Sequence, residues 1–433
     1  MTTAPPSCIT VEEIADGSIG SFLWLAGENF SGRSGILEKV CDRFVDRPGA
    51  AILIPPEVHN AVSGLVPSVL EELLLHAGKR GRCNPFWKLA DQWHLLEWHK
   101  RDPFTLSGGE LAMLVILCKL SLRPQFLCLD GALEQLDSDN LSKVVTLLSR
   151  GKSFQGLRCI LLTHNGYFPE SLTPVPQQVL VETIAYGVQS PPVPPLDEAG
   201  FEPPLVHEPA QIDLVDLGFT YRTGNTVFRN LNLRLEPGRI YRLAGPNGSG
   251  KSTLARLLTG VLRPTQGGLR VNGRKFDSYS RPGALAHLHF QSADSQLFES
   301  TVGAELKSLD ADSKRAATRF AGLGAFLDQH PFDLPFVLRK RLALTVILHS
   351  SAPWLIFDEP VIGQDENSRS AIGKSLRKLA AAGHGVILIS HNAEFARSFS
   401  DEELNLLNLE CGRSANSQSL QLEILPENVA TNP

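Results

Sequence analysis

The chain has 433 residues, of which 42% are hydrophobic and 20% are charged, and its formal net charge is −5. This length is long for one domain and comfortable for two, and the composition is that of an ordinary soluble globular protein. The mildly acidic balance lacks the basic footprint of nucleic-acid-binding proteins, so we expect no nucleic-acid partner, although a local basic patch is not excluded.

The cysteines and the apolar stretches exclude further classes. No pair of cysteines has C-x-x-C spacing, which argues against a zinc knuckle or a redox motif. Cys128 and Cys159 stand in apolar runs, so we expect buried, reduced thiols. No stretch reaches the roughly 18 apolar residues that cross a bilayer, and the first ten residues do not read as a signal peptide. If the protein drives transport, its membrane part lies in other chains.

The first half opens with an expected strand at Ser21–Ala26 that runs into a Gly-rich loop. This loop has the spacing of a phosphate-binding P-loop but carries arginine in the lysine position, and its defining residues are Gly27, Gly32, Arg33 and Ser34. Arginine keeps the charge but is a bulkier planar fork than lysine. Phosphate binding can survive this exchange, whereas correct placement of a terminal phosphate is not expected.

A second anion-binding pattern follows at Ser107, Gly108, Gly109 and Glu110. A helix that opens on a serine and two glycines directs a hydroxyl, backbone N–H groups and its positive end at an anion. Further along, expected strands at 125–129 and 159–162 lead to Asp130-Gly131 and to His164. Gly131 has no side chain that could act as a general base.

The segment from Tyr186 to Ala210 is rich in proline and has neither helical nor strand periodicity. Such a composition is typical of a semi-rigid, extended linker. We therefore divide the chain into a first domain at 1–187, a linker at 188–209 and a second domain at 210–433.

The second half contains a complete G-x-x-x-x-G-K-[ST] loop after a strand expected at 239–244 and before a helix expected at 252–262. Its residues include Gly245, Asn247, Gly248, Ser249, Gly250, Lys251, Ser252 and Thr253. Its glycines allow backbone N–H groups to surround phosphate oxygens. Lys251 is expected to reach the β- and γ-phosphates, and the Ser252 hydroxyl to ligate Mg²⁺. A plain Gly-rich turn is the alternative, and the strand–loop–helix context argues against it.

Two further strands of the second half end in polar residues. The apolar run Trp354–Phe357 leads to Asp358 and Glu359, and the run 385–389 leads to His391. Asp358 is expected to hold Mg²⁺, and Glu359 to accept a proton from the water that attacks the γ-phosphate. His391 can hold that water, although an isolated histidine at a strand end is usually structural.

Four features recur in the same order on both sides of the linker. They are a Gly-rich loop, an apolar run ending in aspartate, a second aspartate seven positions later, and an apolar run ending in histidine. The copies lie 218 to 228 positions apart. Chance does not order four features twice, so we infer an internal duplication.

The P-loop, the Asp358-Glu359 pair and His391 together resemble the ATP-binding-cassette (ABC) family. The resemblance implies an α/β fold with two P-loop NTPase domains, each a mainly parallel sheet core with a helical subdomain, and hydrolysis of ATP with Mg²⁺. It identifies Gln291 as the Q-loop glutamine that contacts Mg²⁺, and Tyr221 as an aromatic that stacks on adenine. A packed surface aromatic is the alternative reading of Tyr221.

Only the first half carries a near match to the family signature L-S-G-G-Q. Leu106–Glu110 nearly matches it, whereas the second half has Leu334-Pro335-Phe336-Val337-Leu338 in its place. In this family the halves pair head to tail, and each ATP lies between one P-loop and the other half's signature. The resemblance thus implies one complete site, from the second P-loop and the first signature, and one degenerate site.

The stretch after Gln291 resembles the Q-loop of energy-coupling-factor ATPases, which power uptake of vitamins and metal ions. The residues that carry this resemblance are Gln296, Leu297, Phe298, Thr301 and Val302. It implies separate integral membrane subunits as partners and a peripheral position on the cytoplasmic side of the membrane. The alternative is a soluble tandem ABC ATPase acting on ribosomes or nucleic acid. Ribosome-acting members usually join their halves by a long charged helical segment, unlike this proline-rich linker.

Overall fold

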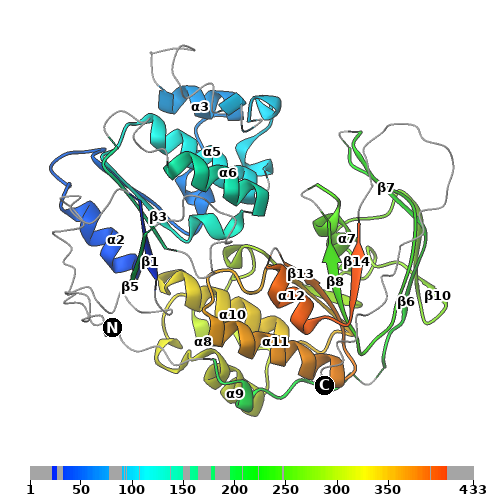
Figure 1. Cartoon of the computed structure of the whole chain (residues 1–433). Helices are drawn as coiled ribbons and strands as arrows, with labels where there is room; N and C mark the ends of the chain where they lie inside the picture. The colour runs from blue at the N-terminus through cyan, green and yellow to red at the C-terminus, as the bar shows by residue number, and fades with distance from the viewer. Residues whose placement is uncertain are drawn as a thin grey trace, which may run out of the picture. The chain divides into compact units, whose positions relative to one another are not determined.

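The computed structural model divides the chain into two compact units, residues 1–193 with 362–366 and residues 194–361 with 367–433. Each unit is described by itself (Figure 1). The structure describes residues 22–26, 33–77, 90–91, 93, 95–106, 108–136, 138–149, 157–163, 177–180, 196–206, 208–222, 224–245, 248–390 and 392–406.

The first unit is built on a five-stranded parallel sheet with the order β2-β3-β4-β1-β5. Its strands are β1 (Phe22–Ala26), β2 (Ala51–Ile54), β3 (Phe126–Asp130), β4 (Cys159–Thr163) and β5 (Gln177–Leu180). Its helices are α2 (Arg33–Asp42), α3 (Val69–Ala77), α5 (Gly108–Ser121) and α6 (Ser138–Ser149). The strands predicted at 21–26, 125–129 and 159–162 are therefore present within a residue of their expected ends.

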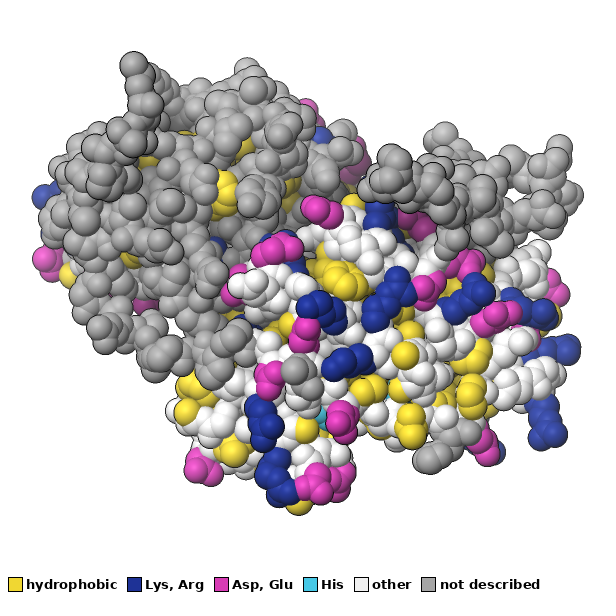
Figure 2. Space-filling model, turned by 60° about the horizontal axis from the view of Figure 1, so that its bottom comes forward, with side chains coloured by type: hydrophobic (Ala, Val, Ile, Leu, Met, Phe, Trp, Pro, Cys, Tyr) yellow, Lys and Arg dark blue, Asp and Glu magenta, His cyan; other side chains and the backbone are white. Residues whose placement is uncertain are grey.

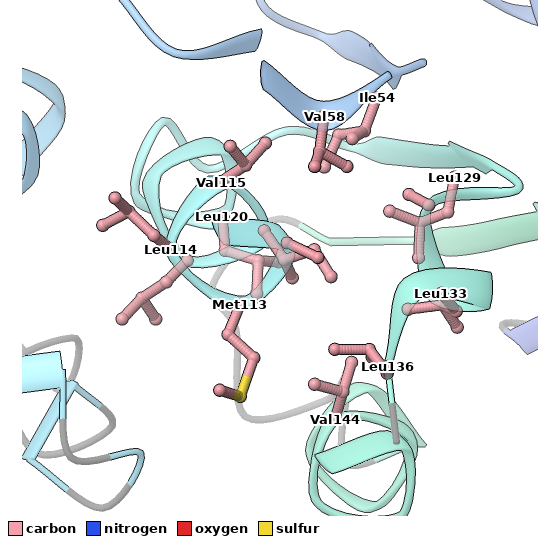
Figure 3. Packing of buried hydrophobic residues seen from close by; sticks show 14 of the residues in the cluster. Ile54, Val58, Met113, Leu114, Val115, Leu120, Leu129, Leu133, Leu136 and Val144 are labelled. Atoms are coloured by element: carbon pink, nitrogen blue, oxygen red, sulfur yellow. The ribbon is translucent and has the colours of Figure 1, made fainter. Parts of the chain in front are cut away.

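This sheet packs on both faces, because alternate residues of β1, β2, β3 and β4 enter different cores. Leu127 and Leu129 of β3 pack with α5 and α6, whereas Phe126 and Cys128 pack with α2. Figure 3 shows the first of these cores, with Met113 of α5 among the buried side chains. Burial on both faces explains why the strands are continuous apolar runs in the sequence.

The second unit contains a parallel sheet with the equivalent order, β11-β12-β13-β8-β14. Its strands are β8 (Ile240–Ala244), β11 (Ala286–His289), β12 (Trp354–Asp358), β13 (Gly385–Ile389) and β14 (Glu402–Asn405). In each unit the P-loop strand lies beside the strand that leads to histidine, which lies beside the strand that ends in aspartate. The predicted α/β fold with two P-loop NTPase domains is confirmed.

The second unit adds a four-stranded antiparallel sheet that the sequence patterns did not predict. Its order is β10-β9-β6-β7, formed by β6 (Ile212–Thr220), β7 (Thr226–Leu235), β9 (Gln266–Val271) and β10 (Arg274–Phe276). Strands β9 and β10 lie in the segment 259–285 between α7 (Lys251–Leu258) and β11. The corresponding segment of the first unit, residues 43–50, is too short for them.

Several helices complete the second unit, and they differ widely in length. They are α8 (Val302–Glu305), α9 (Ala311–Ala321), α10 (Phe336–Leu348), α11 (Glu366–Ala381) and α12 (Ala393–Phe399). None of the helices in the described part of the chain is long and apolar enough to cross a membrane. On the face drawn in Figure 2, basic and acidic side chains of this unit are interspersed.

The later part of the predicted linker packs on the second unit. Phe201 is buried, and its ring centroid lies 5.5 Å from that of Phe320 in α9. The backbone carbonyl oxygen of Pro204 contacts Nε2 of the buried His384 at 2.8 Å. The described residues within 196–209 therefore belong structurally with the second unit, whereas the sequence predicts them to be linker.

Candidate functional site

The P-loop of the second unit connects β8 to α7 and depends on glycine conformations. Gly250 has a positive φ of 97°, and a Cβ atom there would lie 2.6 Å from Cγ1 of Val227 and 2.8 Å from Cζ of Phe228. Gly248 also has a positive φ, of 82°. No side chain larger than hydrogen fits at Gly250, so the loop passes close against β7 and α7 begins at Lys251.

Two oxygen ligands suitable for Mg²⁺ meet beside this loop. The Ser252 hydroxyl lies at the start of α7, and its Oγ is 3.5 Å from Oδ2 of Asp358 at the end of β12. Lys251 donates from Nζ to the carbonyl oxygen of Gly245 at 2.6 Å, which keeps the ammonium group against the loop. A hydroxyl, a carboxylate and a lysine in one place fit the hard magnesium ion and the phosphate oxygens of ATP.

Glu359 is a buried carboxylate held in an unusual backbone conformation. Only 3% of its surface is exposed, and its φ is 52°. Its N–H donates to the carbonyl oxygen of Ile389, and Ser390 donates from Oγ to its Oε2 at 3.2 Å. A left-handed conformation costs a residue with a side chain about 1–3 kcal/mol, and such strain is typical of functional positions. The sequence patterns did not single out Ser390, because a serine before a histidine carries no specific signal.

Gln291 follows β11 at the same edge of the sheet. His289 ends β11 and pairs with Phe357 of β12, which precedes Asp358. Because the carboxyl ends of parallel strands meet at one edge, Gln291, Asp358 and Glu359 all leave the sheet on the side where the P-loop begins. The Gln291 backbone carbonyl accepts a hydrogen bond from Lys340 of α10, which sequence reasoning missed.

Tyr221 follows β6 in the antiparallel sheet and is tied to the P-loop helix. Its hydroxyl lies 2.9 Å from Oγ1 of Thr253, and its ring packs edge-on against Phe219 with the centroids 4.8 Å apart. The side chain is thus packed on one side and connected to α7 on the other. Its predicted stacking on adenine stays a prediction.

In the first unit, the two residues that correspond to Asp358 and Glu359 are arranged differently. Thr163 donates from Oγ1 to Oδ1 of Asp130 at 2.7 Å and accepts from the N–H of Gly131 at 2.8 Å. Gly131 has a φ of 61°, so it shares the left-handed conformation of Glu359 but supplies no carboxylate. Arg33 is only 9% exposed. Burial lowers the pKa of its guanidinium, while the nearby carboxylates of Glu134 and Asp130 act in the opposite direction.

The two signature segments follow the same local turn. A short 3₁₀ helix at Pro103–Thr105 precedes Leu106, and another at Pro331–Asp333 precedes Leu334. Helix α5 then opens on Gly108 and Gly109, whereas α10 opens on Phe336 after Pro335, with no side-chain cap. This equivalence supports the alignment of Leu334–Leu338 with the signature. Glu110 is half-buried and lies 3.7 Å from Arg101 through its Oε1.

Some predicted site residues lie outside the described residues, and their roles stay predictions. Ser34, by contrast, is described and exposed at the start of α2. Among the described residues no group of three or more histidine, cysteine, aspartate or glutamate side chains could hold a metal, and the predicted magnesium set uses a single carboxylate. The predicted site residues that lie outside the described part of the chain are Gly27, Gly32, Ser107, His164, Asn247 and His391.

Known proteins resemble this chain in sequence. The ABC transporter family model matches residues 228–362. A putative ABC transporter ATP-binding protein of Pyrococcus abyssi is 32% identical over 207 residues, which cover 45% of this chain and 79% of that protein. A protein of the same description from Methanosarcina mazei is 27% identical over 383 residues, covering 80% of this chain and 75% of that protein.

A structural likeness extends over most of the chain. It is to the solved complex of an archaeal ribosomal stalk protein and an archaeal ribosome recycling factor. The TM-score is 0.54 at 18% identity, with 88% of this chain and 82% of that chain covered. At this identity the likeness shows the fold alone.

The repeated parallel sheet and the P-loop beside Ser252, Asp358 and Glu359 define a P-loop ATPase that uses ATP and Mg²⁺. The chain belongs to the ABC transporter ATP-binding proteins.

Proposed function

We propose that the chain is the ATP-hydrolysing subunit of an ABC transporter, of the energy-coupling-factor type that takes up a vitamin or a metal ion. The observation that carries the ATPase part is the 3.5 Å separation of Ser252 Oγ and Asp358 Oδ2 beside the buried Glu359. Two oxygen ligands and a general base at one edge of a sheet, where a P-loop begins, are what hydrolysis of a nucleoside triphosphate needs.

The proposed hydrolytic site is composite. The second half contributes its P-loop, Gln291, Asp358, Glu359 and His391, and the first half contributes 107–110 across a head-to-tail pairing. The proposed degenerate site combines Arg33 and Gly131 with the segment 334–338. The sorting of all losses onto one site supports this division, because random decay would affect both sites.

In the hydrolytic site each residue has a proposed role. Lys251 binds the β- and γ-phosphate oxygens, and Ser252, Asp358 and Gln291 hold Mg²⁺, directly or through water. Bound Mg²⁺ offsets the negative charge on those oxygens. Glu359 accepts a proton from the water that attacks the γ-phosphorus, while the bond to the bridging oxygen breaks and ADP leaves. Ser107 and the N-terminus of α5 face the γ-phosphate from the other half.

The transport part of the proposal is supported by the residues that follow Gln291. Leu297 and Val302 are buried, and Thr301 caps α8 by accepting from the N–H of Ala304. Phe298 is different, because 83% of its surface is exposed. This exposed aromatic ring is the group that we propose contacts a membrane subunit.

The second candidate is a soluble ATPase acting on ribosomes or nucleic acid. It is favoured by the fold likeness to an archaeal ribosome recycling factor over 88% of this chain. The 18% identity limits that likeness to the fold. The proline-rich segment between the halves favours the transport proposal.

The two candidates are distinguished by the chains that co-purify with the protein from native membranes and from ribosome fractions. Transport predicts small integral membrane proteins, whose recovery falls in a Phe298→Asp variant. Leu205→Asp is the matched control, because Leu205 is also an exposed apolar residue of the second unit. Recovery of ribosomal proteins in place of membrane proteins would overturn the transport proposal.

A further inference from the structure

The Q-loop of the second unit is fastened to helix α10 by three polar contacts. Arg339 Nε lies 3.5 Å from Oδ1 of Asp294. Lys340 donates from Nζ to the carbonyl oxygen of Gln291. Gln296 donates from Nε2 to the carbonyl oxygen of Ala343 at 2.8 Å. The donors and acceptors span residues 291–296, so α10 fixes this loop at its start, middle and end.

The contact of Lys340 differs from the other two because its donor is buried. Only 2% of its surface is exposed. Removing an ammonium group from water costs several kcal/mol unless it finds partners, so its position is strongly determined by the groups that receive its hydrogen bonds. One of these groups is the backbone of Gln291 itself, rather than a side chain that could rotate away.

The N-terminus of helix α10 lacks the residue types that the signature uses to bind a phosphate. It opens after Pro335 on Phe336 and Val337, where α5 has two glycines after a serine. Proline lacks an N–H group, and Phe336 and Val337 supply neither a hydroxyl nor the paired glycines of the signature. The polar contacts of α10 with the Q-loop are therefore separate from any role at the degenerate site.

We propose that Lys340 is a positioning residue for the metal in the hydrolytic site, because it holds the Gln291 backbone where the Gln291 side chain reaches Mg²⁺. This inference rests on the proposed role of Gln291. Groups that orient a metal ligand typically change metal affinity or activity about 10- to 100-fold when they are replaced. Lys340 acts through Gln291 and does not touch the substrate.

The test compares Lys340→Met, Lys340→Arg and Gln291→Ala in the full chain. At fixed ATP, Mg²⁺ is titrated and the concentration that gives half-maximal hydrolysis is measured, together with kcat and the KM for ATP. Methionine matches the lysine stem in length, which limits any loss of packing. Lys374→Met is the matched control, because Lys374 is an exposed lysine paired with Glu198 on the same unit.

Lys340→Met is expected to raise the half-saturating Mg²⁺ concentration and lower kcat by about tenfold each, with the KM for ATP nearly unchanged. Lys340→Arg is expected to change both quantities much less than Lys340→Met, because arginine can still donate to the Gln291 carbonyl. In the Gln291→Ala background the same lysine change has little further effect, because its route through Gln291 is already lost. If Lys340 had a merely structural role, Lys340→Met would lower the midpoint of thermal unfolding. The protein that remains folded would then need the same Mg²⁺ concentration for half-maximal hydrolysis as the wild type.

The outcomes separate the two proposals. If Gln291→Ala raises the Mg²⁺ requirement and Lys340→Met does not, the positioning role is overturned and the proposed function stands. Additive effects in the double variant overturn the positioning role as well. If Gln291→Ala itself keeps the wild-type Mg²⁺ dependence, the proposed role of Gln291 fails, and the inference about Lys340 fails with it. Should Lys340→Met not fold, the arginine variant and hydrogen exchange of residues 290–298 provide the comparison.

Discussion

Ser252 Oγ lies 3.5 Å from Asp358 Oδ2, although 106 positions separate the two residues in the chain. The first begins the helix that follows the P-loop, and the second ends the strand β12. Their meeting places a hydroxyl and a carboxylate where both could hold the proposed magnesium ion. It also explains why a loop and a strand end so distant in sequence act as one site.

Asp358→Asn is therefore expected to raise the Mg²⁺ concentration needed for hydrolysis and to lower the rate by about 100-fold, because the only charged oxygen of this pair is lost. Ser252→Ala has the same direction and a smaller size. Titration of Mg²⁺ in an ATPase assay checks both. Ser280→Ala is the control, since Ser280 also donates to an aspartate, Asp277, at 2.6 Å but lies elsewhere. Unchanged Mg²⁺ dependence in Asp358→Asn would contradict the assignment.

Glu359→Gln is expected to lower hydrolysis by about 10²–10⁴-fold while ATP binding is retained. Glutamine preserves the size of the side chain and can still accept from Ser390, but it cannot take a proton from water. Single-turnover hydrolysis and nucleotide binding, measured on the same preparation, separate the two effects. Loss of both activities together would indicate unfolding rather than loss of a base.

Arg33→Lys restores the P-loop consensus of the first half but is expected to leave hydrolysis within about twofold of wild type. Gly131 still provides no carboxylate there, and general acid–base catalysis is worth about 10²–10⁴-fold. Lys251→Ala, by contrast, is expected to abolish hydrolysis. Steady-state ATPase rates of the two variants test the asymmetry. A clear gain of activity in Arg33→Lys would show that the first half has its own catalytic site.

The parallel sheets could be predicted from the sequence because burial of their strands leaves a clear pattern. Strands such as Trp354–Asp358 are buried on both faces, so they appear as continuous apolar runs between a loop and a polar residue. The P-loop and the Asp358-Glu359 pair have fixed spacing because backbone geometry sets it. These patterns are local, and they singled out Ser252 and Asp358, which the structure brings together in the second unit.

Features that depend on distant contacts could not be predicted. The strands β6 and β7 are amphipathic and pair through a bulged, irregular register, which leaves no simple alternation. The left-handed conformation of Glu359 has no signal in the residue type. The hydrogen bond from Lys340 to the Gln291 carbonyl joins residues that are 49 positions apart. A lysine in a helix is ordinarily read as exposed, and only the structure shows that it is buried.

The proline-rich segment illustrates the same limit. Prolines and the absence of periodicity predicted a linker up to residue 209, yet Phe201 is buried against Phe320. Phe201→Ala is expected to destabilise the second unit by about 3–5 kcal/mol, because a large buried ring is removed. Leu205→Ala, at a residue that is 69% exposed, is the control. Urea denaturation, monitored by hydrogen exchange of α9, measures the stability of both variants. Equal unfolding midpoints for Phe201→Ala and Leu205→Ala would contradict the packing of this segment.

The proposal of a composite hydrolytic site is tested most directly by ATP hydrolysis in a Ser107→Arg variant, with ATP binding measured in parallel. Ser107 belongs to the first half, whereas the P-loop, Asp358 and Glu359 belong to the second. We expect that binding to the second P-loop persists while hydrolysis falls by about 100-fold or more, nearly as far as in Glu359→Gln. Wild-type turnover in Ser107→Arg would contradict it and would assign the whole catalytic site to the second half.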